Sequence, residues 1–211
     1  MKWVSAALTM LLALTGRSAG GQAFDYSPGF EPGAPVEMTP LSFLPGEWRI
    51  ELFTPVDAEE AEPRWQAWDT TSGRFEAIYG GAFIREIGDG FPVGRNSIGA
   101  EGFDRWAYQA TFSWDRFQRV YRATYIDNIT GLLDIYQGPS DDGQLILTNL
   151  HTGTYNTLGT DGSVQFGRVI LSEIADDRFV MTWQTVDQAD VPQGGAVPWR
   201  WGRKMIYQRQ R

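Results

Sequence analysis

Asp127 is the side chain in this sequence best placed for acid–base chemistry, because it ends a run rich in aromatic residues. Tyr125 lies two positions before it, and Asp134 follows soon after. A carboxylate held in an apolar cavity can act as a general base. The alternative, and the commoner case, is a carboxylate whose hydrogen bonds are satisfied at the rim of a fold.

Other kinds of catalytic or metal site find little support in the residue types. The chain has one histidine, His151, and no cysteine. This composition excludes disulfide bonds, thiolate nucleophiles and the usual zinc ligand sets. A Ser-His-Asp triad would also depend on His151. We interpret this residue as a strand-end residue or a hydrogen-bond partner, and haem ligation is the alternative weighed against that interpretation. We therefore expect no metal site and no cofactor, and name no catalytic residue outright.

Aromatic residues alternate along the stretch that leads to Asp127. Trp106, Tyr108, Phe112 and Trp114 are separated by small or polar residues, which is the period-two pattern of a strand with one apolar face. Such a face either packs into a core or lines a cavity. The alternation is consistent with both.

Turn signals predict which residues share that face. A turn centred on residues 116–117 pairs Tyr108 with Tyr125 and Trp106 with Asp127. Directly opposed residues on antiparallel strands lie on the same side of the sheet. We therefore expect Tyr125 and Asp127 on the inward, aromatic face.

A second turn signal lies at residues 176–177, where two aspartates separate two apolar runs. With the turn centred there, Arg168 and Trp183 also lie on an inward face. Asp127 and Arg168 then either pair with each other or bind a polar group of a ligand, since an isolated buried charge is costly.

Short period-two segments joined by turns cover most of the chain, and no long amphipathic helix is indicated. The expected strands are 47–53, 65–79, 82–88, 105–114, 119–127, 131–137, 144–152, 164–174, 178–186 and 200–209. About ten strands with short links are typical of an antiparallel barrel or sandwich. We predict an all-β fold, a single antiparallel up-and-down barrel of about ten strands.

The N-terminal residues have the features of an export signal. A basic start precedes an apolar run that is too short to span a bilayer, and small residues follow. We expect a signal peptide at 1–23, an irregular leader at 24–40 and the barrel at 41–211; the alternative is an uncleaved anchor. A cysteine-free exported chain suits a bacterial periplasm or secretion, with no membrane span after signal removal.

Several short motifs resemble a known family in their order. They are LPGEW at 44–48, YGGAF at 79–83, GFD at 102–104, YIDN at 125–128, DDRFVMTW at 176–183 and the closing MIYQRQR. The series is similar to a bacterial domain-of-unknown-function family with a lipocalin-like (calycin) β-barrel. The resemblance implies a closed barrel with a central cavity and an arginine of the last strand stacked over Trp48. We expect this arginine to be Arg209, with Arg211 as the alternative. It brings no established activity.

These observations lead to two functional hypotheses. The first is an exported barrel that binds a small apolar or amphipathic ligand; the expected ligand-binding residues are Trp106, Tyr108, Tyr125, Asp127, Arg168 and Trp183. The ligand body would lie against the aromatic residues and its polar end near Arg168. The second is an enzyme that uses the same cavity with Asp127 as base. The net charge of −8 argues against nucleic acid as a partner, and no motif indicates an oligomeric state.

Overall fold

Alternating apolar and polar residues build the strands of this protein and give each strand one buried face. The computed structural model describes residues 33–92, 104–155, 157–158 and 163–211. The long strands are β1 (Gly46–Pro55), β2 (Trp65–Ile78), β3 (Phe83–Pro92), β4 (Arg105–Asp115), β5 (Val120–Asp127), β6 (Leu133–Gly138), β8 (Gln144–Thr148), β10 (Val164–Ser172), β11 (Arg178–Asp187) and β12 (Arg200–Arg209). Two short strands, β7 (Ser140–Asp141) and β9 (Thr157–Leu158), lie at the margins.

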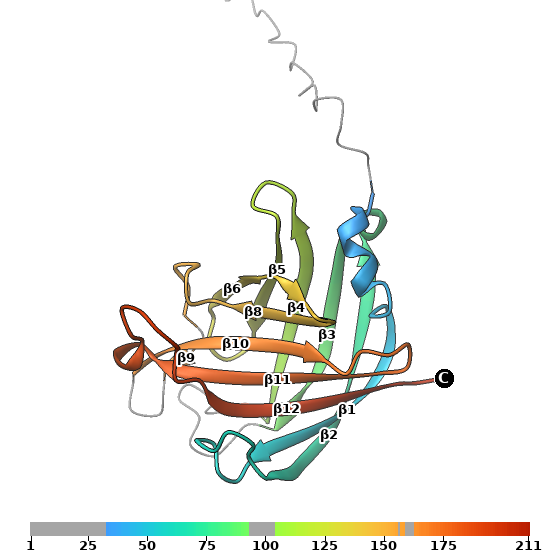
Figure 1. Cartoon of the computed structure of the whole chain (residues 1–211). Helices are drawn as coiled ribbons and strands as arrows, with labels where there is room; N and C mark the ends of the chain where they lie inside the picture. Colours follow the sequence, from blue (N-terminus) through green and yellow to red (C-terminus); the bar gives the residue numbers. More distant parts are fainter. Residues whose placement is uncertain (1–32, 93–103, 156, 159–162) are drawn as a thin grey trace, which may run out of the picture. The chain divides into compact units, whose positions relative to one another are not determined.

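The strands close into a ring in which each pairs with its neighbours along the chain (Figure 1). β1 pairs with β2 on one side and with β12 on the other, and β8 pairs with both β6 and β10. All of these pairings are antiparallel. The expected all-β, up-and-down barrel of ten strands is therefore confirmed.

One end of the barrel is closed by Trp48 at the start of β1. Its ring is fully buried, and its Nε1 donates a hydrogen bond to the Leu44 carbonyl at 2.8 Å. The guanidinium carbon of Arg209 lies 4.4 Å from the centre of the Trp48 ring, and Arg209 Nη1 donates to the Pro45 carbonyl at 2.8 Å. The cation–π arrangement expected from the resemblance is present.

A short 3-10 helix, η1 (Val36–Leu41), covers the same end. Met38 and Leu41 are buried in the core, and the Tyr121 hydroxyl donates to the Glu37 carbonyl at 2.6 Å. The packed core therefore begins a few residues before the expected boundary at 41, and this part of the leader is ordered rather than irregular. The expected signal peptide lies outside the described residues.

The other described helices are single 3-10 turns, η2 (Tyr79–Gly81) and η3 (Gln188–Asp190). In the ranges that the structure describes, no helix is long and apolar enough to cross a bilayer.

The β4–β5 hairpin has a different register from the expected one but keeps the expected faces. Tyr108 pairs with Asp127, and Ala110 pairs with Tyr125. The turn lies one position later, because the Asp115 carboxylate accepts the N–H of Phe117 at 2.9 Å and closes a loop over residues 116–119. Moving the centre by one position shifts the pairing by two residues, which preserves the side of the sheet.

The β10–β11 hairpin corrects the expected face of Arg168. Trp183 pairs with Val169, and Arg168 pairs with Gln184. This register differs from the expected one by a single residue, and such a slip moves a side chain to the other face of a sheet. Arg168 therefore points away from the interior, where its Nε donates to Gln184 Oε1 at 2.7 Å and its guanidinium lies 4.9 Å from the centre of the Trp199 ring.

Candidate functional site

The interior of the barrel is packed at the closed end and hollow beyond it. At the closed end Phe179 and Tyr207 stack with their ring centres 4.2 Å apart, and Trp48 meets Phe179 edge-on at 5.0 Å. Beyond these rings lies a cavity of about 70 Å³, counted as the space open to the centre of a water molecule. The aromatic face therefore serves as core in one part and as cavity wall in another.

The cavity walls are almost wholly apolar, with one carboxyl group and one guanidinium among them. The lining residues are Glu86, Phe91, Tyr108, Ala110, Phe112, Ala123, Thr124, Tyr125, Tyr136, Leu147, Val169, Met181, Trp183, Arg203, Met205 and Tyr207.

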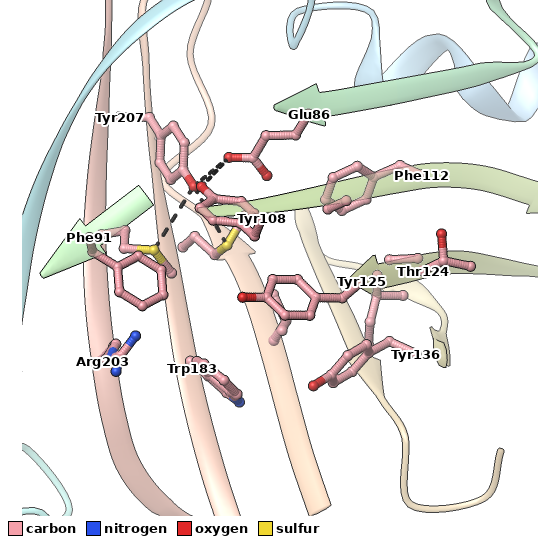
Figure 2. Close-up of a pocket in the computed structure, with 16 residues that line it drawn as sticks. Glu86, Phe91, Tyr108, Phe112, Thr124, Tyr125, Tyr136, Trp183, Arg203 and Tyr207 are labelled. Atoms are coloured by element: carbon pink, nitrogen blue, oxygen red, sulfur yellow. Dashed lines mark hydrogen bonds between the residues drawn. The ribbon is translucent and has the colours of Figure 1, made fainter. Parts of the chain in front are cut away.

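Glu86 is the buried carboxyl of the cavity wall. Glu86 is 1% exposed. Its Oε1 accepts hydrogen bonds from the hydroxyls of Tyr108 at 2.8 Å and Tyr207 at 2.9 Å (Figure 2). Burial raises the pKa of Glu86 to about 7, and the two hydrogen bonds oppose that rise. Near neutral pH this carboxyl exists in both protonation states.

Gly88 allows Tyr108 to reach Glu86. A Cβ atom at Gly88 would lie 2.4 Å from Cε1 of Tyr108, closer than any real contact. The Tyr108 ring therefore lies against the backbone of β3 at Gly88, two residues along the strand from Glu86. Glycine in a strand commonly marks such a close approach.

Arg203 lies within a cage of aromatic rings. Its guanidinium carbon is 4.3 Å from the ring centre of Phe91, 5.0 Å from that of Trp68, and 5.8 Å from those of both Trp106 and Trp183. Burial lowers the pKa of Arg203 to about 10, so the group stays positively charged at neutral pH. Among the described residues, Arg203 forms no ion pair.

A β-bulge at Gly202 interrupts the alternation of β12 next to Arg203. Arg203 pairs with Trp183, but the next pair along the ladder is Trp201 with Gln184, so Gly202 has no partner. The extra residue turns Trp201 to the outside, where its Nε1 donates to the Glu60 carbonyl at 3.0 Å. Bulges often re-aim side chains in this way.

Two further bulges shape the cage. In the β1–β2 ladder the register shifts after the Leu52–Asp69 pair, which leaves Trp68 as the extra residue. In β3 the extra residues include Gly90, whose φ of 85° suits glycine and where a Cβ would lie 2.5 Å from the Trp106 carbonyl oxygen. Irregularities in separate strands thus bring the rings of the cage together.

A second buried polar network ties together the strands that close the barrel. Asp134 is 2% exposed; it accepts hydrogen bonds from the Tyr136 hydroxyl at 2.8 Å and from Asn149 Nδ2 at 3.0 Å. Asn149 Oδ1 in turn accepts the N–H of Gly167 at 2.7 Å. Because these residues come from β6, from just beyond β8, and from β10, the network has a structural role at the closing ladder.

The structure brings together several of the residues expected to bind a ligand. Tyr108, Tyr125 and Trp183 all line the cavity. Trp106 lies beside it, with its ring centre 5.7 Å from that of the lining residue Phe91.

Two expected site residues do not line the cavity. Arg168 faces outward, as described above. Asp127 hydrogen-bonds within its own turn: Oδ1 accepts the N–H groups of Ile129 at 2.8 Å and Thr130 at 2.6 Å, and Oδ2 accepts the Thr130 hydroxyl at 2.9 Å. A carboxylate occupied in this way is a turn-capping group, and the placement of Asp127 at a ligand site is corrected.

The sequence reasoning did not identify Glu86 and Arg203, although both carried a signal. The turn at Gly80-Gly81 fixes the register of β3 and places every second residue, including Glu86, on the inward side. Counting back from Arg209 in steps of two gives Tyr207, Met205 and Arg203. The period-two alternation of β3 and of β12 therefore places Glu86 and Arg203 on the inward side.

The single histidine, His151, is exposed in the turn after β8. In the described part of the chain, no group of three histidine, cysteine, aspartate or glutamate residues is placed to hold a metal ion.

Comparisons with known proteins leave the resemblance as an expectation. No protein-family model matches the chain, and no curated protein is significantly similar to it. The functional argument therefore depends on the cavity and its two polar groups.

Proposed function

We propose that this protein is an exported barrel that binds one compact apolar or aromatic molecule in its interior cavity. The observation that supports the proposal is a space of about 70 Å³ bounded by aromatic and aliphatic side chains. On this measure one water molecule needs about 10–15 Å³. Protein interiors are otherwise close-packed, and unfilled cavities cost stability, so an apolar space of this size suits a bound molecule.

Catalysis by Asp127 has no supporting observation. Both of its oxygens accept hydrogen bonds within the turn after β5. Glu86, the carboxyl that does line the cavity, already accepts two tyrosine hydroxyls. A binding role is therefore preferred over an enzymatic one.

The export part of the proposal, to a periplasm or the exterior, depends on residues 1–23 alone. Sequencing of the N-terminus of protein from its native host tests it separately. A mature chain that begins between about Gly20 and Phe24 supports export, whereas an intact Met1 in a soluble cytoplasmic fraction contradicts it.

Binding is tested with 2-phenylethanol, a neutral molecule of one aromatic ring, by calorimetry and by following the tryptophan indole N–H signals in ¹H–¹⁵N spectra. We expect saturable binding that shifts the signal of Trp183. Native mass spectrometry of the host-purified protein should in addition reveal a co-purified small molecule.

A matched pair of variants locates the binding. Ala123 lines the cavity, so Ala123→Phe fills it and should abolish binding. Ala77 is exposed near the end of β2 and does not line the cavity, so Ala77→Phe adds the same bulk elsewhere and should leave binding intact. Equal binding to both variants would place the ligand elsewhere and refute the proposal.

A further inference from the structure

We infer that the ligand carries one carboxylate group and that Arg203 binds it at the end of the cavity remote from Glu86. This inference depends on the proposed function and adds the charge and the orientation of the ligand. Four unpaired donor groups near the cavity support it.

The first group is the caged guanidinium itself. Nη1 of Arg203 is inaccessible to solvent and has no hydrogen-bond partner among the residues that the structure describes. The rings of Phe91 and Trp68 offer the cation their faces at 4.3 and 5.0 Å, but they cannot accept strong hydrogen bonds as a carboxylate can. A buried cation without an anion is costly, so this part of the structure lacks an anionic partner.

Three neutral donors near Arg203 are unpaired in the same way. In the described part of the chain, Nε1 of Trp106, Nε1 of Trp183 and the hydroxyl of Tyr125 are all buried without a well-formed hydrogen bond, although the Trp106 indole N–H approaches the Tyr125 hydroxyl. Trp106 and Trp183 belong to the cage around Arg203. In Figure 2 the Tyr125 hydroxyl points into the cavity on the side of Arg203, whereas the indole nitrogen of Trp183 is directed toward Tyr136.

Other tryptophans of this barrel show that the unpaired indoles are unusual. Nε1 of Trp48 donates to the Leu44 carbonyl at 2.8 Å, and Nε1 of Trp201 donates to the Glu60 carbonyl at 3.0 Å. Buried indole N–H groups normally find an acceptor. The groups near Arg203 therefore lack acceptor atoms within the described part of the barrel, and a ligand can supply them.

The chemistry of these groups selects the ligand. Guanidinium and indole groups donate hydrogen bonds and accept none. A ligand that satisfies them must bring acceptors, and a carboxylate brings two oxygens and the negative charge that Arg203 lacks.

The opposite part of the cavity excludes a second carboxylate. There Tyr108 and Tyr207 already donate to Glu86 Oε1, and an added negative charge would be repelled by the ionised form of Glu86. The apolar body of the ligand therefore lies toward these residues, with its carboxylate at Arg203.

The test compares phenylacetate with 2-phenylethanol, which has a hydroxymethyl group in place of the carboxylate. Charge-assisted hydrogen bonds predict that phenylacetate binds about tenfold more tightly or better. Phenylacetate should also shift the indole N–H signals of Trp106 and Trp183, whose rings surround Arg203. The signals of Trp48 and Trp201, whose N–H groups are already bonded, serve as internal controls.

Variants of two arginines separate a carboxylate site from a general effect of charge. Arg203→Met should remove the preference for phenylacetate, so that the two molecules bind with similar affinity. Arg168→Met, on the outer face of the same barrel, should preserve the preference. Trp183→Phe removes one donor, and it provides a second reading of the same site if Arg203→Met does not fold.

The outcomes distinguish this inference from the proposed function. Equal binding of both molecules, or a preference that survives both Arg203→Met and Trp183→Phe, overturns the carboxylate site and leaves the binding function standing. Absence of binding by either molecule overturns both.

Discussion

Replacement of Glu86 by glutamine should change how the stability of this barrel depends on pH. The folded-state pKa of about 7 lies above the ordinary value of 4.5 because the carboxyl is buried. The folded protein therefore holds a proton on Glu86 that the unfolded chain has released between these two values. Stability from this group is fully present below about pH 4.5 and is lost as the pH rises toward 7.

The size of the effect follows from the two pKa values of Glu86. Their difference of 2.5 units corresponds to about 3.4 kcal/mol in total, at about 1.36 kcal/mol per unit. Roughly 0.8 kcal/mol of this is already lost at pH 5. Between pH 5 and pH 8 the wild type should therefore lose about 2.5 kcal/mol more than Glu86→Gln. The glutamine carbonyl can still accept the hydroxyls of Tyr108 and Tyr207.

Urea unfolding of both proteins at a series of pH values measures this difference directly, because the other titrating groups are common to both. Glu76→Gln is a useful control, since hydrogen bonding to Arg85 holds the pKa of Glu76 below its usual value and gives the opposite trend. Parallel stability curves for wild type and Glu86→Gln would show that Glu86 titrates normally and would refute the reasoning.

Three further substitutions test the closure, the cavity wall and the excluded site. Trp48→Ala should cost roughly 3–5 kcal/mol in chemical denaturation, because the ring is fully buried; a loss below about 1 kcal/mol contradicts the closure. Gly88→Ala should cost about 1–3 kcal/mol by forcing the Tyr108 ring aside, whereas Gly194→Ala, with nothing within 4 Å, should be nearly neutral by the same measurement. Asp127→Asn should leave the dissociation constant of 2-phenylethanol unchanged in calorimetry. A large loss of affinity would show that Asp127 contributes to the binding site.

The strands and the closure were predictable because they depend on local signals. Apolar and polar residues alternate along each strand. This alternation places Trp48, at the start of the first strand, and Arg209, at the end of the last strand, on inward faces. The resemblance added only that these two residues meet. The same alternation predicted that Tyr108, Tyr125 and Trp183 face the interior, and they line the cavity.

The face of Arg168 was not predictable, because it depends on the length of one turn. The link between β10 and β11 holds Glu173 at a φ of 50° and joins the Ala175 N–H to the Arg178 carbonyl at 2.8 Å. Centring the turn on Asp176-Asp177 instead gives a register one residue away. An error of one residue reverses a side chain, whereas the error of two in the β4–β5 hairpin is harmless.

The aromatic cage around Arg203 could not be predicted from any single strand. It requires bulges at Trp68, Gly90 and Gly202, and a bulge is defined by a partner strand that the local sequence does not contain. Alternation alone would have placed Trp201 inside beside Arg203. The bulge at Gly202 removes that ring from the interior and leaves Arg203 without it as a neighbour on the inward face of β12.

The two charged groups of the cavity differ in how their burial is compensated, and this difference points to the function. Glu86 is compensated within the chain, because Tyr108 and Tyr207 donate to it and its raised pKa allows it to become neutral. Arg203 remains charged near neutral pH, and among the described residues it is surrounded by aromatic rings and forms no ion pair. A buried group that is satisfied by its neighbours explains the stability of a fold. A buried cation that its neighbours leave unpaired is better explained by a molecule that the fold has yet to bind.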